Sequence, residues 1–376
     1  MATIETNNFF ESKREYSEIK SEILIDYCKI WFEGLFSGKR SKPAGTALYI
    51  DLHAGEACPE DGKVAATPLR VLHSIYKSHG SRYDLNKSVQ AFFNDPDKAA
   101  LASLQDAIEG LPYYEELVHK PVVLLEDADA ELLRYLLHNG CPALLFTNPF
   151  RYTFSHELLL QTLTTGETDL LMLFSPDEIM AAVKNSKADN LTQEIFGDRL
   201  YQIRAFYKEN RNTEKREEYL LDIFEGIFQD RSFGTVRFRI NLPDRKHTSH
   251  YLIFASKADS ACTRLKEMMV KYSEYQEDGV PLFGANLNYQ QMSLFHDHYK
   301  FSIESLKQDL LQKAPLYHNM ALQQVYEKHN VGTHYMLENY KVAYEQLMRQ
   351  GLVRFYNPKT GQSVNKPAYT SLVRYK

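Results

Sequence analysis

The sequence predicts an α/β protein with a Rossmann-like, mainly parallel sheet, followed by a smaller helical domain. Short apolar segments, such as residues 46–52 and 142–150, alternate with helical segments of about 10 to 15 residues. A segment that is apolar at consecutive positions is typical of a strand buried on both faces. Past about residue 285 the alternation gives way to successive helices. We therefore expect a sheet-based domain at residues 1–285 and a helical, winged helix-turn-helix-like domain at residues 286–376.

The order of the expected elements narrows the fold class further. Residues 16–36 carry apolar side chains at helical spacing and predict an N-terminal amphipathic helix. Five strands then alternate with helices, and two more strands follow as a hairpin-like pair. This order fits the seven-stranded sheet of class I S-adenosylmethionine-dependent methyltransferases better than a plain dinucleotide-binding sheet. The expected strands lie within residues 46–52, 89–93, 121–127, 142–150, 168–175, 234–242 and 249–256.

Composition and charge exclude several classes of protein. Of the 376 residues, 44% are hydrophobic and 25% are charged, so we expect a packed core rather than disorder. The net charge of −5 argues against strong non-specific binding of nucleic acid by the whole surface, although basic residues gather near the C-terminal end. The N-terminal segment is polar, and no segment approaches the roughly 20 apolar residues that cross a bilayer. We expect a cytoplasmic protein without membrane contact. The four cysteines lack the spacing of metal ligands, and we expect reduced thiols at Cys28, Cys58, Cys141 and Cys262.

The first expected strand ends in an acid and is followed by a turn of small residues. In methyltransferases of this fold, such an acid favours the positively charged amino-acid end of S-adenosylmethionine, and a glycine lets the backbone approach the ligand. Asp51 and Gly55 meet these needs, and His53 and Ala54 line the turn. The alternative is an aspartate that only caps the segment after the strand.

The next two expected strands also end in polar residues. Asn94 and Asp95 stand where an acid binds the ribose hydroxyls, and Asp127 stands where a polar residue lies near the adenine. Helix capping is the alternative function of these acids, because Asp-Pro before an alanine-rich helix is itself an N-cap pattern. Three consecutive strand ends with carboxylates together favour a cofactor site for S-adenosylmethionine. No glycine-rich phosphate loop with a lysine is present.

The fourth expected strand ends in a candidate catalytic loop. Methyltransferases that act on exocyclic amines carry an (Asp/Asn)-Pro-Pro-aromatic loop here, whose polar group accepts a hydrogen bond from the amine and whose ring stacks on the base. Asn148, Pro149 and Phe150 supply the polar group, the turn and a ring, and Tyr152 adds a second ring. An ordinary strand-to-helix turn is the alternative.

Over most of its length the chain resembles the three-Cys-motif partner protein (TcmP) family. Family members begin with a Lys-x-x-Ile-Leu-x-x-Tyr-x-x-x-Trp helix and continue with Tyr-x-Asp-x-x-Ala-Gly. The matching residues here are Lys20, Ile23, Leu24, Tyr27, Trp31, Tyr49, Asp51, Ala54 and Gly55. An Asp-Pro-Phe-Gly-like loop is similar to residues 148–151, and a Thr-Ser-x-Tyr-Leu-Ile-Phe-Ala strand is similar to residues 248–255.

The resemblance implies a methyltransferase-like domain, a C-terminal winged helix and a partner protein of the radical-SAM type that carries the three-cysteine motif. Two departures from the family pattern stand out. Glu56 and Ala57 follow Gly55 where the family has Pro-Gly, and Asn148 replaces an aspartate. The first departure affects the cofactor turn. The second preserves a hydrogen-bond acceptor for an amine.

Two functions follow from these patterns. The first is methyl transfer from S-adenosylmethionine to an exocyclic amine, such as that of a nucleic acid. The second is a non-catalytic scaffold with a methyltransferase fold that binds nucleic acid or a protein partner through its winged helix. In the second case Arg349, Arg354, Lys359, Lys366 and Arg374 would contact phosphates.

Overall fold

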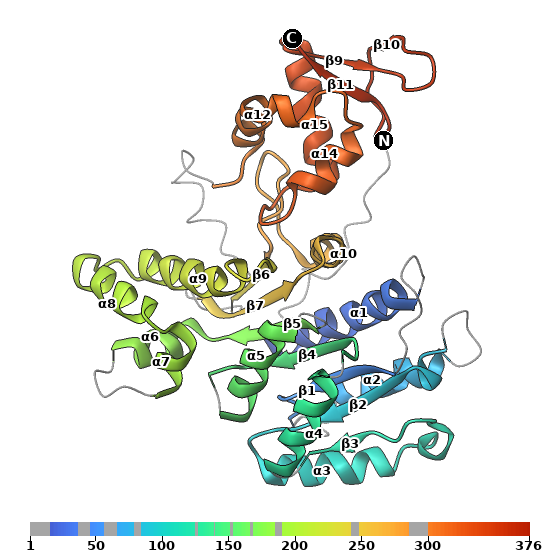
Figure 1. Ribbon diagram of the computed structural model, residues 1–376, viewed down its shortest axis with the longest axis vertical. Coiled ribbons are helices and arrows are strands. Elements are labelled where there is room, and N and C mark those ends of the chain that lie inside the picture. Colours follow the sequence, from blue (N-terminus) through green and yellow to red (C-terminus); the bar gives the residue numbers. More distant parts are fainter. Residues whose placement is uncertain are drawn as a thin grey trace. The chain divides into compact units, whose positions relative to one another are not determined.

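The computed structural model shows a mixed α/β fold built on a large, parallel-rich sheet of eight strands (Figure 1). The chain divides into two compact units, residues 14–261 and residues 262–376. The domain boundary predicted from the sequence lies later, at residue 285. The structure describes residues 16–36, 46–55, 66–78, 84–124, 127–138, 140–150, 153–165, 168–184, 190–241, 248–285 and 300–376.

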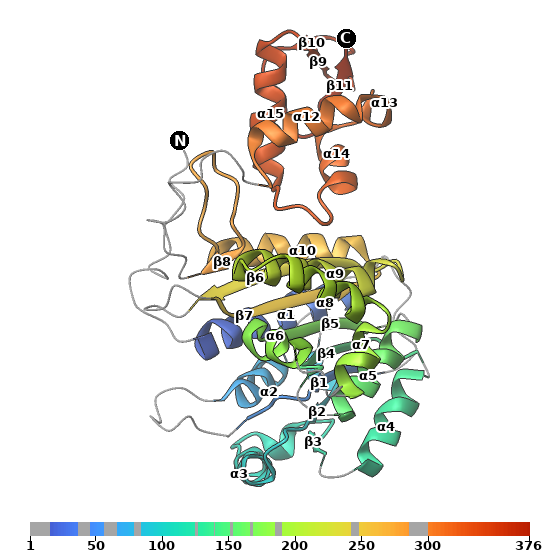
Figure 2. The ribbon, with the colours of Figure 1, turned by 90° about the vertical axis from the view of Figure 1, so that its left-hand side faces the viewer.

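The strands of the first unit lie in the order β3-β2-β1-β4-β5-β7-β6. Figure 2 shows them following one another across the sheet. β1 to β5 run parallel to one another, and β7 runs antiparallel between β5 and β6. The predicted series of parallel strands followed by an antiparallel pair is thus confirmed. The strand bounds are β1 Ala47–Asp51, β2 Val89–Phe93, β3 Val122–Val123, β4 Ala143–Thr147, β5 Thr168–Phe174, β6 Gly234–Asn241 and β7 Thr248–Ser256.

Helices of the first unit connect the strands and cover the sheet. The predicted N-terminal helix forms as α1 (Tyr16–Phe36). The others are α2 Thr67–Lys77, α3 Lys98–Glu109, α4 Asp127–His138, α5 Thr153–Thr165, α6 Pro176–Lys184, α7 Asn190–Phe196, α8 Arg199–Glu209 and α9 Thr213–Gln229, with short 3-10 turns at Leu85–Lys87 and Tyr114–Glu116. In the described residues, no helix is long and apolar enough to cross a membrane.

Alternate residues of the strands face opposite sides of the sheet, and both sides are covered. Leu48 and Ile50 of β1 belong to one large core with side chains of α4 to α9. Tyr49, on the opposite face, packs edge-on against Phe93 of β2. On that second face the ring of Tyr27 in α1 lies 5.0 Å from the ring of Phe254 in β7. Burial on both faces explains why β1 and β4 are apolar at nearly every position.

α1 is fixed over the sheet by polar contacts as well as by packing. Near its C-terminal end, the indole Nε1 of Trp31 donates a hydrogen bond of 2.8 Å to the carboxylate of Asp169 in β5. Ser256 of β7 donates to the other oxygen of the same carboxylate, at 2.5 Å. Hydrogen bonds to a charged acceptor each contribute about 1.5–3 kcal/mol. The Asp169 carboxylate of β5, which Trp31 and Ser256 share, therefore fixes the C-terminal end of α1 on the sheet.

The second unit contains several helices and a small antiparallel sheet in the order β10-β9-β11. Between α13 and α14, Ala321 forms an isolated bridge to Leu372 of β11, so a short extended segment joins the edge of this sheet. The elements are α10 Asp259–Met269, a 3-10 turn at Val270–Tyr272, β8 Gly284–Ala285, α12 Ile303–Gln312, α13 Ala314–Tyr317, α14 Leu322–His329, α15 Leu337–Arg349, β9 Val353–Tyr356, β10 Ser363–Val364 and β11 Leu372–Tyr375.

An ion-pair cluster attaches α9 to the sheet and predicts a strong effect on stability. Arg237 of β6, with a side chain 16% exposed, contacts Glu218, Asp222 and the buried Glu225 of α9. Burial raises the pKa of Glu225, and the charge of Arg237 opposes that rise. Arg237→Met should lower the free energy of unfolding by about 3 kcal/mol, because it leaves a buried carboxylate without its partner. Urea unfolding at neutral pH measures the loss, with the exposed Arg231→Met as control. Equal stability of the two variants would contradict the prediction.

Candidate functional site

The polar residues predicted to form a site come together where β1, β2 and β4 end. Asp51, the last residue of β1, pairs in register with Phe93 of β2 and Phe146 of β4. Backbone hydrogen bonds continue past the strands, from Asn94 N to Asp51 O at 2.8 Å and from Leu52 N to Phe146 O at 3.0 Å. The turns after the three strands therefore form one edge of the sheet, as parallel strand order requires.

Asp51 is buried, with 1% of its surface exposed. Its Oδ1 accepts a hydrogen bond from the backbone N–H of His53 at 2.9 Å, and its Oδ2 accepts one from the Tyr49 hydroxyl at 3.2 Å. The first bond shows that Asp51 does cap the turn after its strand. Burial raises the pKa of the Asp51 carboxyl to about 6, against the opposing effect of the Lys20 charge. The two hydrogen bonds and the Lys20 charge thus stabilise the ionised Asp51 but do not offset its burial fully.

Lys20 of α1 supplies that cation, and the sequence did not identify it as a site residue. Its ammonium is attracted by the charges of Asp51 and Asp95, although burial lowers its pKa. The Lys20 Nζ also lies 5.4 Å from the centre of the Phe146 ring. In the sequence Lys20 was only the first residue of the family-like helix pattern. Nothing in the chain order connects it with Asp51, because their attraction depends on how α1 crosses the sheet.

The turn after β1 is held against the turn after β2. Ala54 N donates to Asn94 O at 3.1 Å, and Gly55 N donates to Asp95 Oδ2 at 2.9 Å. Gly55 has a φ of 68°, in the left-handed region that a glycine adopts without strain. Asp95 therefore fixes the glycine turn, and its other oxygen accepts from the N–H of Asp97 at 2.9 Å.

Helix capping after β2, the alternative function considered for Asp95, is performed by Asp97. Asp97 accepts hydrogen bonds from Ala99 N and Ala100 N and is the N-cap of α3. Asp95 is left to the glycine turn. Asn94 is buried and donates from Nδ2 to Leu124 O at 2.5 Å, which links the end of β2 to the end of β3. Asp127 is the first residue of α4, and its side chain lies outside the described residues.

The turn after β4 lies beside the turn after β1. Asn148 N donates to His53 Nδ1 at 3.1 Å, so the proton of the neutral His53 ring is on Nε2. Asn148 is buried, and its Oδ1 accepts from Phe150 N at 3.1 Å. Of the predicted loop residues, Tyr152 lies outside the described residues, and Pro149 is buried.

The Phe150 ring packs into the core. Its centre lies 5.7 Å from that of Phe174, 5.8 Å from that of Phe196 and 5.6 Å from that of Phe224. These partners come from β5, α7 and α9 and belong to the main core of the unit. Phe150 thus anchors the Asn148 turn by packing, a role that its position in the sequence did not suggest.

The arrangement suits a small molecule that carries both charges. The Asp51 carboxylate and the Lys20 ammonium attract each other near the carboxyl ends of the strands, and the left-handed turn at Gly55 follows β1. Parallel sheets bind ligands at this edge, beyond the carboxyl ends of their strands. Among the described residues no group of three or more His, Cys, Asp or Glu side chains has the arrangement of metal ligands.

Comparison with known proteins gives little beyond this geometry. No protein-family model and no curated protein matches the chain. A solved Legionella pneumophila protein of the family DUF519 is 9% identical, with a TM-score of 0.37, over 68% of this chain and 94% of that one. A SAM-dependent methyltransferase from Methanosarcina mazei is 12% identical, with a TM-score of 0.26, over 56% of this chain and 92% of that one. Scores this low carry no argument about function.

The buried carboxyl predicts a pH dependence of stability. The pKa of Asp51 rises from an ordinary 3.8 to about 6 in the folded protein, so between these values the folded state holds a proton that the unfolded state releases. Stability should therefore fall as the pH rises from about 4 to 6, by about 3 kcal/mol relative to Asp51→Asn, which does not titrate. Urea unfolding of both proteins across this range measures the difference. A difference that stays constant with pH would rule the effect out.

Proposed function

We propose that residues 14–261 bind S-adenosylmethionine and transfer its methyl group. The observation that carries the proposal is the strand order, combined with the buried Asp51 at the end of the central strand β1. A 3-2-1-4-5 parallel order also occurs in dinucleotide-binding sheets, where the sixth strand is parallel too. An antiparallel strand inserted next to β5, as β7 is here, is the arrangement of class I methyltransferases.

The residues at the sheet edge fit the charges of this cofactor. Its α-ammonium group would bind Asp51, and its carboxylate would bind Lys20, so that each buried charge gains a partner of opposite sign. Asn94 and Asp95 would face the ribose hydroxyls. Both Asp95 oxygens already accept backbone N–H groups, but each carboxylate oxygen accepts more than one hydrogen bond.

The acceptor in this proposal is an exocyclic amine of a nucleic acid. When bound, S-adenosylmethionine would supply an activated methyl group, so the protein would need only to align the acceptor amine, which loses one proton to solvent as it gains the methyl group. Asn148 would orient the amine through its side-chain oxygen. Because Phe150 is packed in the core, Tyr152 is the candidate for stacking on the base. A radical-SAM protein with the three-cysteine motif is the protein partner that the TcmP resemblance implies.

A catalytically inactive scaffold is the second candidate function. Its support is the basic C-terminal segment, which holds no Asp or Glu from residue 346 to residue 376. A chain that kept the fold without binding the cofactor would still present this segment. Measuring cofactor binding separates the two functions.

Cofactor binding should depend on the ionised Asp51. Calorimetry with S-adenosylmethionine at pH 7.5 should detect binding that weakens about tenfold at pH 5, one unit below a pKa of about 6. Asp51→Asn should bind weakly at both values, because the amide carries no charge. Lys20→Met should weaken binding without removing the pH dependence.

The matched control is Asp106→Asn, an exposed aspartate of α3. Removing its charge changes the net charge equally but leaves the sheet edge intact, so its affinity should equal that of the wild type. The absence of binding heat with the wild type, or equal losses in both aspartate variants, would refute the cofactor site.

Methyl transfer should depend on the Asn148 side chain. Asn148→Ala should lower the rate about a hundredfold, the typical effect of losing one orienting hydrogen bond in a catalytic site. Asn148→Asp should keep the turn and most of the rate, because a carboxylate oxygen replaces the amide oxygen. The measurement is transfer of tritium from labelled S-adenosylmethionine to unmethylated DNA and RNA strands. Cofactor affinity must stay unchanged in both variants, and an undiminished rate in Asn148→Ala would exclude this role.

A further inference from the structure

Charge is distributed very unevenly along the chain. The whole protein has an excess of acids and a net charge of −5. The 31 residues Gln346–Lys376 nevertheless contain six Lys and Arg and no Asp or Glu. This acid-free segment comprises the end of α15 and the whole of the sheet β10-β9-β11. The first-unit site and its cofactor do not account for it.

The basic side chains of this segment are held on ordered structure and exposed to solvent. The turn between β9 and β10 is closed by Asn357, whose Oδ1 accepts hydrogen bonds from Lys359 N at 2.8 Å and Thr360 N at 3.3 Å. This turn presents Lys359 to solvent. Arg354, Lys359 and Lys366 are all exposed. Arg374 is partly used within the fold, because its Nε donates to Asn319 Oδ1 at 2.7 Å.

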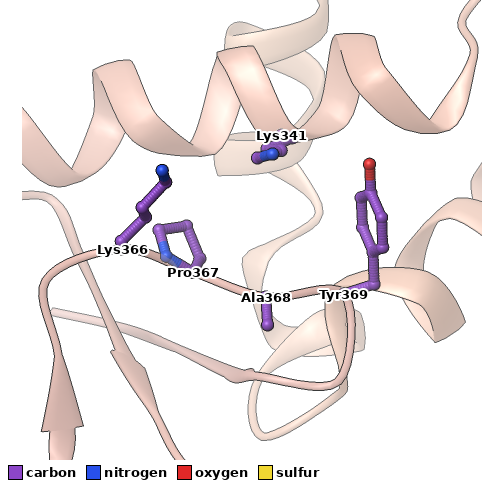
Figure 3. A pocket seen from close by; sticks show the side chains of 5 residues that line it. All are labelled: Lys341, Lys366, Pro367, Ala368 and Tyr369. Atoms are coloured by element: carbon purple, nitrogen blue, oxygen red, sulfur yellow. The ribbon is translucent and has the colours of Figure 1, made fainter. Parts of the chain in front are cut away.

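Next to these cations the surface is hollowed. A depression of about 350 Å³ lies between α15 and the segment after β10, lined by Lys341, Lys366, Pro367, Ala368 and Tyr369. Figure 3 shows Lys366 and Tyr369 reaching from the segment toward the helix that carries Lys341, with Pro367 and Ala368 between them. The Lys341 ammonium lies 5.6 Å from the centre of the Tyr369 ring.

The lining combines two features that a nucleotide requires. Lys341 and Lys366 contribute two ammonium groups that phosphate oxygens would meet, and Pro367, Ala368 and the Tyr369 ring contribute apolar surface for a sugar or base. A positively charged groove with aromatic side chains is the common means of binding nucleic-acid strands without sequence preference. Glu338 weakens the positive potential of this site. Its carboxylate lies at the hollow, where it accepts a hydrogen bond from the Tyr369 hydroxyl.

We propose that the hollow formed by Lys341, Lys366 and Tyr369 binds the sugar-phosphate backbone of a nucleic-acid strand. The chemistry recognised is a phosphodiester next to an apolar ring, which DNA and RNA share. A concave site with an apolar floor favours a strand over a flat anionic membrane. The proposal does not depend on methyl transfer or on the cofactor.

The test measures binding by the full-length protein. Fluorescein-labelled single-stranded DNA, RNA and duplex DNA of about 20 nucleotides are titrated by anisotropy at salt concentrations from roughly 50 to 200 mM. The double variant Lys341→Gln/Lys366→Gln is compared with Lys208→Gln/Lys328→Gln, which removes two exposed lysines elsewhere and changes the net charge equally. Vesicles of phosphatidylserine and phosphatidylcholine serve as the membrane probe.

We expect the wild type to bind strands. The variant Lys341→Gln/Lys366→Gln should bind them about tenfold more weakly. For a single strand, the slope of log affinity against log salt concentration should become shallower by about 1.4, because two phosphate contacts are lost. The control pair should keep the wild-type slope. The stronger of the DNA and RNA arms identifies the source of the strand. Equal losses in both pairs, no binding of any strand, or binding of vesicles alone would overturn the proposal.

A single substitution tests the same site in the opposite direction. Glu338→Gln removes the negative charge but keeps an oxygen that accepts the Tyr369 hydroxyl. Strand affinity should therefore rise in this variant, by roughly as much as one phosphate contact contributes. An unchanged or lower affinity would contradict the placement of the strand in the hollow.

Discussion

The first unit depends on one buried charge, the carboxylate of Asp51 at the end of the central strand. Taking a carboxylate out of water is costly unless a cation and hydrogen bonds offset the loss. The Tyr49 hydroxyl and the His53 N–H supply two bonds, and Lys20 supplies the cation. Because Lys20 comes from α1, its attraction to Asp51 links the N-terminal helix to the end of β1. The site and the packing of the helix are therefore one constraint.

The far end of α1 obeys the same constraint. Trp31 is held by the Asp169 carboxylate of β5, which Ser256 of β7 also contacts. Lys20 and Trp31 both face the sheet through polar groups, and Tyr27 between them contacts Phe254 by its ring. Lys20 and Trp31 are therefore two polar side chains through which α1 interacts with the sheet.

The strands and the Asp51–Gly55 turn were predictable from the sequence, whereas the positions of Lys20 and Phe150 were not, because tertiary packing determines them. The strands were predictable because both their faces are buried, so β1 and β4 are apolar throughout. Asp51 and Gly55 were identifiable because a strand end and a glycine turn are adjacent in sequence. The pairing of Asp51 with Lys20 was not, because it joins elements that only the fold brings together. Likewise, Phe150 resembled a base-stacking ring, and only α7 and α9 show that it packs in the core.

The aspartates after β2 show how finely local roles are divided. Sequence alone could assign either Asp95 or Asp97 to the start of α3, because both precede it. The structure gives the N-cap to Asp97 and leaves Asp95 to hold Gly55, so a residue that pattern alone treats as a cap becomes part of the turn next to Asp51. The N–H of Gly55, in its left-handed turn, finds its acceptor in Asp95 after the next strand. Both oxygens of Asp95 thus accept backbone N–H groups, from Gly55 and from Asp97. A ligand hydroxyl that binds Asp95 must donate to an oxygen that already accepts one of these bonds.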